Sequence, residues 1–152
     1  MPLILSSLVN NIRQINDEQY PLFEGFPANS IEAADRWSIA IGNYASLVIP
    51  PSSGSEAAKQ ALKSSLLSVP TLGEQAIVQG LISYSSFLAL GMAPAFNAIP
   101  PPIPPVLTPA FELGFSGASA EQVANLLGSI IDGWFRTGTA INTISGVTVN
   151  WN

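Results

Sequence analysis

Residues 72–92 read LGEQAIVQGLISYSSFLALGM, and the other predicted elements are arranged around this segment. Its apolar residues lie on every side of a helical wheel, a pattern that indicates either a helix buried in a core or a membrane span. About 20 residues at 1.5 Å each reach roughly 30 Å, enough to cross a bilayer. Four central polar residues and the absence of basic or Trp-rich flanks at both ends favour a buried helix; the four are Gln79, Ser83, Ser85 and Ser86. A membrane-inserting protein, pore-forming or holin-like and using residues 75–96, is the alternative.

Further helices are predicted around this one by apolar residues that recur three and four positions apart. They cover residues 3–17, 30–48, 53–69 and 119 to about 138, with a short helical turn after Thr108. Four segments carry a capping residue followed three positions later by Glu or Gln, the signature of a helix start: residues 29–32, 53–56, 71–74 and 119–122. The sequence therefore predicts an all-α fold, a bundle of about five helices in a single domain spanning residues 1–152.

A proline-rich stretch interrupts the helices. Five of the six residues 100–105 are proline, which predicts an extended arm over residues 99–107. Such an arm is either a rigid connector or a ligand for an aromatic groove on a partner. Because Ile99, Ile103, Val106 and Leu107 are apolar, we expect the arm to pack along a surface.

The end of the sequence changes period. Val147, Val149 and Trp151 alternate with polar residues, which predicts a short β-strand within a tail of residues 145–152. A lone strand needs a partner edge, either in this chain or on a neighbour. A large aromatic residue so close to the end is predicted to anchor the chain in a pocket of a partner.

Charge is scarce and unevenly placed. Charged residues make up 10% of the chain, against roughly 25% in typical soluble domains. Ten of the fifteen lie in residues 1–63, and none lies between Glu74 and Glu112 or after Arg136. The net charge of −5 and the lack of a basic cluster argue against nucleic acid as a partner. A surface so poor in charge suits burial against neighbouring proteins.

Residues for catalysis are few. The chain has no cysteine and no histidine, which removes thiolate chemistry, the commonest general base and the commonest metal ligand. Glu32 and Asp35 share a helix face and could form an acid–base pair or a cation site, but acids at a helix start are favoured by the helix dipole alone. We therefore expect no enzyme, no cofactor and no metal site; an enzyme that uses only carboxylates is a third alternative.

Several stretches resemble small virion structural proteins of contractile-tailed bacteriophages. They are residues 37–44 (WSIAIGNY), 91–96 (GMAPAF), 133–139 (GWFRTGT) and 146–151 (GVTVNW). The resemblance implies a repeated subunit of a tail, neck, baseplate or capsid surface. It implies a location in the virion after assembly in the host cytoplasm, and no catalytic residues.

A non-enzymatic structural subunit is thus the predicted function. We expect an oligomer whose partners are copies of itself or other virion structural proteins, with neither nucleic acid nor a membrane among them. The predicted partner-binding residues are Ile99, Pro101, Ile103 and Pro105 of the arm and Val147, Val149 and Trp151 of the strand.

Overall fold

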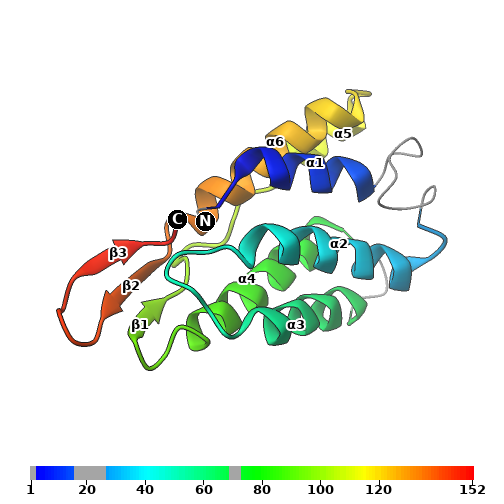
Figure 1. Ribbon diagram of the computed structural model, residues 1–152. Helices are drawn as coiled ribbons and strands as arrows, with labels where there is room; N and C mark the ends of the chain where they lie inside the picture. Colours follow the sequence, from blue (N-terminus) through cyan, green and yellow to red (C-terminus); the bar gives the residue numbers. More distant parts are fainter. Residues whose placement is uncertain (1–2, 16–26, 69–72) are drawn as a thin grey trace.

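The computed structural model describes residues 3–15, 27–68 and 73–152. Within these ranges the chain is mostly helical, with six helices and three short strands (Figure 1). In chain order they are α1 (Leu5–Ile15), α2 (Ser30–Ala45), α3 (Ser55–Leu67), α4 (Glu74–Leu90), β1 (Phe96–Ile99), α5 (Thr108–Phe115), α6 (Ala120–Phe135), β2 (Thr139–Asn142) and β3 (Thr148–Asn150).

The predicted helices are confirmed, with ends that move by a few residues. The short turn expected after Thr108 is an eight-residue helix, α5. Two of the predicted helix starts have the expected caps: the Glu32 N–H donates to Asn29 Oδ1 over 2.9 Å, and Ser119 and Gln122 form a complete capping box. The start predicted at Thr71 lies outside the described residues.

The capping box predicted at Ser53 is wrong. The residue before α3 is Gly54, and no side chain caps that helix. The Ser53 hydroxyl donates instead to the carbonyl oxygen of Gly91, at the end of α4, over 3.1 Å. The backbones are close here, because a Cβ on Gly91 would lie 2.1 Å from the Gly54 nitrogen. The Ser53 side chain therefore contributes to the contact between α3 and α4 and does not cap α3.

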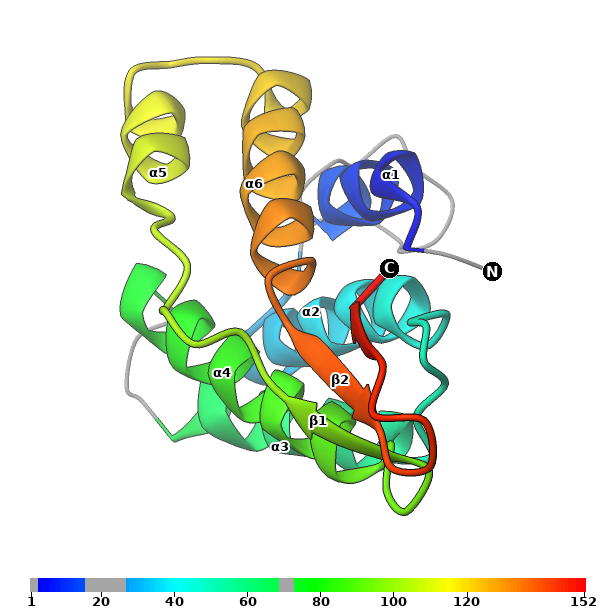
Figure 2. The ribbon, with the colours of Figure 1, turned by 90° about the vertical axis from the view of Figure 1, so that its left-hand side faces the viewer.

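The helices form two groups of three. In one group α3 packs against both α2 and α4; in the other α6 lies between α1 and α5 (Figures 1 and 2). The groups are joined where α1 packs on α2. Leu81, Tyr84 and Leu88 of α4 are fully buried, as expected of a core helix. In the part of the chain that the structure describes, no helix is both long enough and apolar enough to cross a membrane.

The sheet is larger than the single predicted strand. Its order is β1-β2-β3, antiparallel throughout, and its register places Ala98, Ala140 and Val149 side by side. Of the two alternatives for the last strand, the structure has the first, because β3 pairs with β2 of the same chain. The sequence does not reveal β1 and β2, because each has only four residues and neither FNAI nor TAIN alternates apolar with polar residues.

Residues 100–107, here called the proline segment, link β1 to α5 without helix or strand. The indole Nε1 of Trp134 in α6 donates to the carbonyl oxygen of Ile103 over 2.6 Å. This hydrogen bond holds the segment beside α6.

A group of three polar side chains, which we call the clasp, ties distant parts of the chain together. Tyr44 Oη donates to Asp132 Oδ1 over 2.6 Å, and Arg136 Nε donates to Asp132 Oδ2 over 2.9 Å. Arg136 also donates to the carbonyl oxygen of Leu3 and to Asn152 Oδ1. The hydrogen bond to Asp132 raises the pKa of Arg136, and burial raises the pKa of Tyr44, so both remain donors at neutral pH.

Candidate assembly surface

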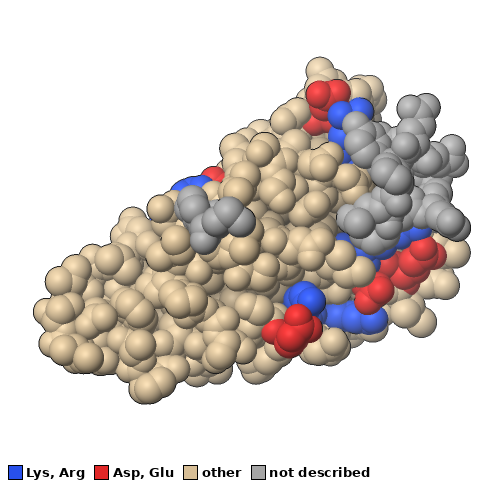
Figure 3. Space-filling view, viewed as in Figure 1, with Lys and Arg blue, Asp and Glu red and all other residues tan. Residues whose placement is uncertain are grey.

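Charge divides the molecule into two parts. Residues 91–107 and 137–152, which we call the sheet end, contain all three strands and the proline segment but no charged side chain. Figure 3 shows charged groups over the helices and none over the strands on the visible face. An interface core is depleted of charge in this way, whereas solvated surfaces carry both signs.

Several apolar side chains of the sheet end face outward. Ile103 is 72% exposed and Val106 is 65% exposed, both in the proline segment. Further apolar residues add to this surface: Ile99, Val147 and Val149, with Phe87 and Leu90 at the neighbouring end of α4. Exposed apolar side chains in this number, with no charged side chain among them, favour a contact with another protein.

Among the large apolar residues that the structure describes, the most exposed is Ile144, at 96%, at the tip of the β2–β3 hairpin, residues 143–147. The tip is held in one conformation by Asn142, whose Oδ1 accepts the N–H groups of Ile144 (3.0 Å) and Ser145 (2.8 Å). The chain reverses at Gly146, whose φ of +69° is a left-handed conformation that glycine adopts without strain. A turn normally carries polar residues, so an isoleucine at this position needs an explanation.

The hairpin tip is also tied to the turn that precedes β1. Thr143 Oγ1 donates toward the carbonyl oxygens of Pro94 and Ala95, each over 3.1 Å, and the Thr143 N–H donates to Ala95 O. Ile144 is therefore presented by an ordered loop.

A groove, which we call the proline groove, lies between the proline segment and α6. Residues 102–106 form one wall, and Ile130, Gly133, Trp134 and Thr137 form the other. Its volume is about 480 Å³, and none of its lining residues is ionisable. Concave apolar sites of this size accept side chains or ligands of similar character.

The structure separates the predicted partner-binding residues into two sets. Ile99, Ile103, Val147 and Val149 are exposed. Pro101 is half-buried, and Pro105 is buried inside the chain.

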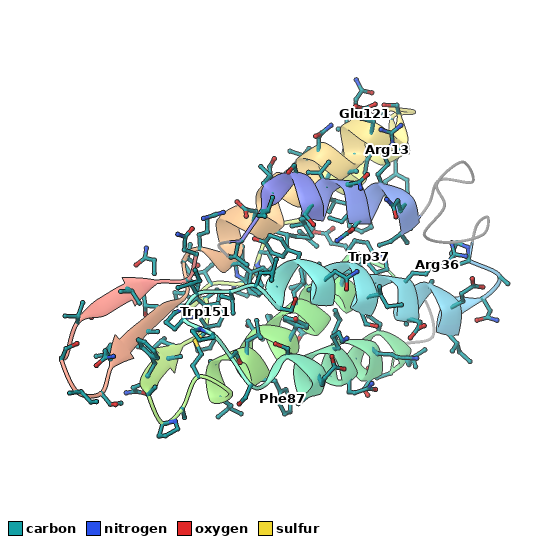
Figure 4. All side chains as sticks on the ribbon, viewed as in Figure 1. Arg13, Arg36, Trp37, Phe87, Glu121 and Trp151 are labelled. Atoms are coloured by element: carbon teal, nitrogen blue, oxygen red, sulfur yellow. The ribbon has the colours of Figure 1, made fainter. Side chains whose placement is uncertain are left out.

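Trp151 does not present a free anchor to a partner, and that prediction is corrected. It is 1% exposed, and Figure 4 shows it where the sheet meets the helices. Its ring stacks on Phe135 at a centroid distance of 6.5 Å, and its Nε1 donates to Thr139 O over 3.2 Å. Gly138 makes room for it, because a Cβ there would lie 2.5 Å from the Trp151 ring. Trp151 fastens the sheet end to the chain's own helices.

Ile144 was not among the predicted contact residues. Its only signal in the sequence is an isoleucine followed by Ser145-Gly146, a turn-forming pair. That signal becomes visible once the flanking segments are known to pair as strands.

The carboxylates considered for chemistry are each paired with a basic side chain. Glu32 bonds to Arg36, and Asp35 accepts Lys63 Nζ over 2.6 Å. The N–H of Ala28 and the Arg36 guanidinium hold the pKa of Glu32 below its usual value. Among the described residues, no three potential metal-ligating side chains come together.

Comparison with known proteins adds no family. No protein-family model, curated protein sequence or solved structure matches this chain.

Proposed function

We propose that this chain is a non-enzymatic structural subunit of a large protein assembly, acting through packing contacts made by its sheet end. The observation that carries the proposal is an uncharged surface on which Ile103, Val106 and Ile144 stand exposed. A lone molecule gains nothing from exposing these side chains to water. Each would contribute about 1.5–3 kcal/mol if fully buried against a neighbour, before the costs of association.

In this proposal the helices act as a bundle that holds residues 99–107 as an arm, and the arm and hairpin make the contacts. The assembly we propose is a bacteriophage virion, built in the host cytoplasm, with the chain in its tail, neck, baseplate or capsid surface. The identity of the assembly rests on the resemblance of residues 37–44, 91–96, 133–139 and 146–151 to such proteins.

The first test is the mass of the protein in solution. Sedimentation velocity at increasing concentration should show oligomers of the wild-type chain. Ile103→Lys, which places a charge on the uncharged surface, should shift the distribution toward monomer. Leu67→Lys is the matched control, because Leu67 is exposed at the end of α3, outside the sheet end, and should leave the distribution unchanged.

The second test concerns the virion. Mass spectrometry of purified bacteriophage particles whose genome encodes the chain should detect it at many copies per particle. Its gene should lie among genes for virion structural proteins. A monomer at all concentrations that is also absent from such particles would contradict the proposal.

A further inference from the structure

We infer that the hairpin tip of one copy docks in the proline groove of a second copy, with Ile144 as the inserted side chain. This inference rests on the proposed function and names the contact through which copies would associate. It joins two features that lie on different elements of the same chain, an exposed apolar projection and an apolar concavity.

The projection is organised before any contact forms. Three backbone N–H groups around Ile144 are already bonded to Asn142: those of Ile144 and Ser145 to its side chain and that of Gly146 to its carbonyl oxygen. Thr143 fixes the same loop to the turn before β1. Because the loop is already ordered, docking would lose little conformational entropy.

The side-chain donors that line the groove are already paired, so an apolar side chain can cover them without breaking their hydrogen bonds. Its Trp134 indole N–H is already bonded to Ile103 O, and its Thr137 hydroxyl donates to Trp134 O over 2.7 Å. Covering satisfied donors with a hydrocarbon avoids the penalty of about 1–3 kcal/mol for each buried unpaired group. Exposed Ile103 and Val106 on its wall would be covered in the same step.

Between two copies of this chain, charge favours a contact of the tip with the groove over a contact through the helices. The chain carries a net charge of −5, so contacts through the charged helices would bring like charges together. Neither the tip nor the groove contains an ionisable side chain, and a contact between them keeps the helices' charges outside the buried area.

Two alternative contacts between copies are less well supported. A tip-to-tip contact would oppose two projections. Pairing along the outer edge of β3 would have a short ladder, because Asn152 beyond its end is already bonded to Ile49 in both directions (3.0 and 2.8 Å). Tip into groove is a contact between different surfaces, which repeats from copy to copy and builds rings or filaments.

The absence of cysteine from the chain makes disulfide trapping a clean test. Ile144→Cys and Val106→Cys would be made as separate variants, one of them carrying a mass tag, and mixed under mild oxidation. We expect a mixed disulfide dimer in the mixture and little cross-linking of either variant alone. A chain with both substitutions should give a ladder of cross-linked oligomers. Leu67→Cys, mixed with each variant, measures the background from random collision.

A companion variant tests the contact without cross-linking. Ile144→Asp should weaken association by roughly tenfold or more, as expected for a central apolar contact, and should leave the unfolding midpoint unchanged. Ser145→Asp is its control, because it adds the same charge to the neighbouring exposed residue and should weaken association less.

The outcomes are distinct. Cross-linking of Ile144→Cys with itself above background would show a tip-to-tip contact and overturn the inference. A double variant that stops at dimers would overturn the repeating geometry. If the wild type forms oligomers while the mixture stays at background, the docking inference fails and the proposed function stands. If the wild type is monomeric and absent from particles, both fail.

Discussion

The helices and the sheet end of this molecule meet water in opposite ways. The helices carry ion pairs such as Arg13–Glu121, 3.5 Å apart at the end far from the strands (Figure 4), and Glu56–Lys59. The sheet end has no ion pair because it has no charged residue, and it exposes isoleucine and valine. The uncharged sheet end accounts for only part of the low overall charge, because the other residues hold all 15 charged side chains and are still poorer in charge than typical soluble domains, in which roughly 25% of residues are charged. The charge content of a chain is therefore informative about assembly only when the positions of the charged residues in the fold are known.

The two parts are joined by a buried region rather than by a linker. Trp151 packs on Phe135, which also contacts Tyr44 and Tyr84 edge-on. The clasp lies in the same place. Because these side chains are buried, substitutions among them should lower the free energy of unfolding far more than substitutions of exposed residues on the helices or the sheet end.

The largest effect is expected from Trp151→Ala. Removing a fully buried ring should lower the free energy of unfolding by about 3–5 kcal/mol, measured by urea denaturation. Ile144→Ala, on the exposed tip, should change it by less than about 0.5 kcal/mol. Equal losses from the two substitutions would contradict the placement of Trp151 in the core.

A second comparison sets the clasp against a surface ion pair. Asp132→Ala leaves the Tyr44 hydroxyl and part of the Arg136 guanidinium without an acceptor and should cost about 2 kcal/mol of unfolding free energy. Asp35→Ala removes only the exposed pair with Lys63 and should cost less than about 1 kcal/mol. The reverse order would mean that the clasp adds no net stability.

Removing the hydroxyl from each of two buried tyrosines near Phe135 should change the free energy of unfolding in opposite directions. Tyr84 Oη has no hydrogen-bond partner among the described residues, so Tyr84→Phe should raise the free energy of unfolding by about 1 kcal/mol. Tyr44→Phe removes a donor to Asp132 and should lower it by a similar amount. Thermal denaturation of the two variants side by side would measure the difference, and a loss of stability in both would indicate that Tyr84 is paired.

The sequence predicts the structure of the helices better than the structure of the sheet end. The helices could be predicted, because the apolar stripes of α2 and α6 and the caps at Asn29 and Ser119 are signals within a short stretch of sequence. Of the sheet, only β3 could be predicted from its alternating residues; β1 and β2 could not, because four-residue segments without apolar–polar alternation become strands only by pairing with each other. Trp151 was misplaced because the space that receives it is created by Gly138, whose role depends on tertiary structure. The exposed Ile99 and Ile103 could be singled out because a proline run flanked by apolar residues is easily recognised in the sequence, whereas Ile144 required knowledge of the hairpin.

The smallest expected effect is the pH response of the helix start at Glu32. The folded pKa of Glu32 lies below its ordinary value, so its contribution to stability is present above that ordinary value and is lost as the pH falls through the lowered pKa. In urea denaturation, wild type should be slightly more stable than Glu32→Gln at pH 7, and the gap should close in acid below about pH 4. A gap that stays constant down to pH 3 would show that the carboxylate charge has no part in it.

The clasp has a consequence for the order of events during synthesis. Arg136 donates to both Leu3 and Asn152, so this contact joins residues far apart in the sequence and forms only after Asn152 has left the ribosome. The contacts among α2, α3 and α4 join neighbours in sequence and are available much earlier. We expect the uncharged surface to be completed only after residue 152 has emerged, which would delay association between copies until the helices of each one have folded.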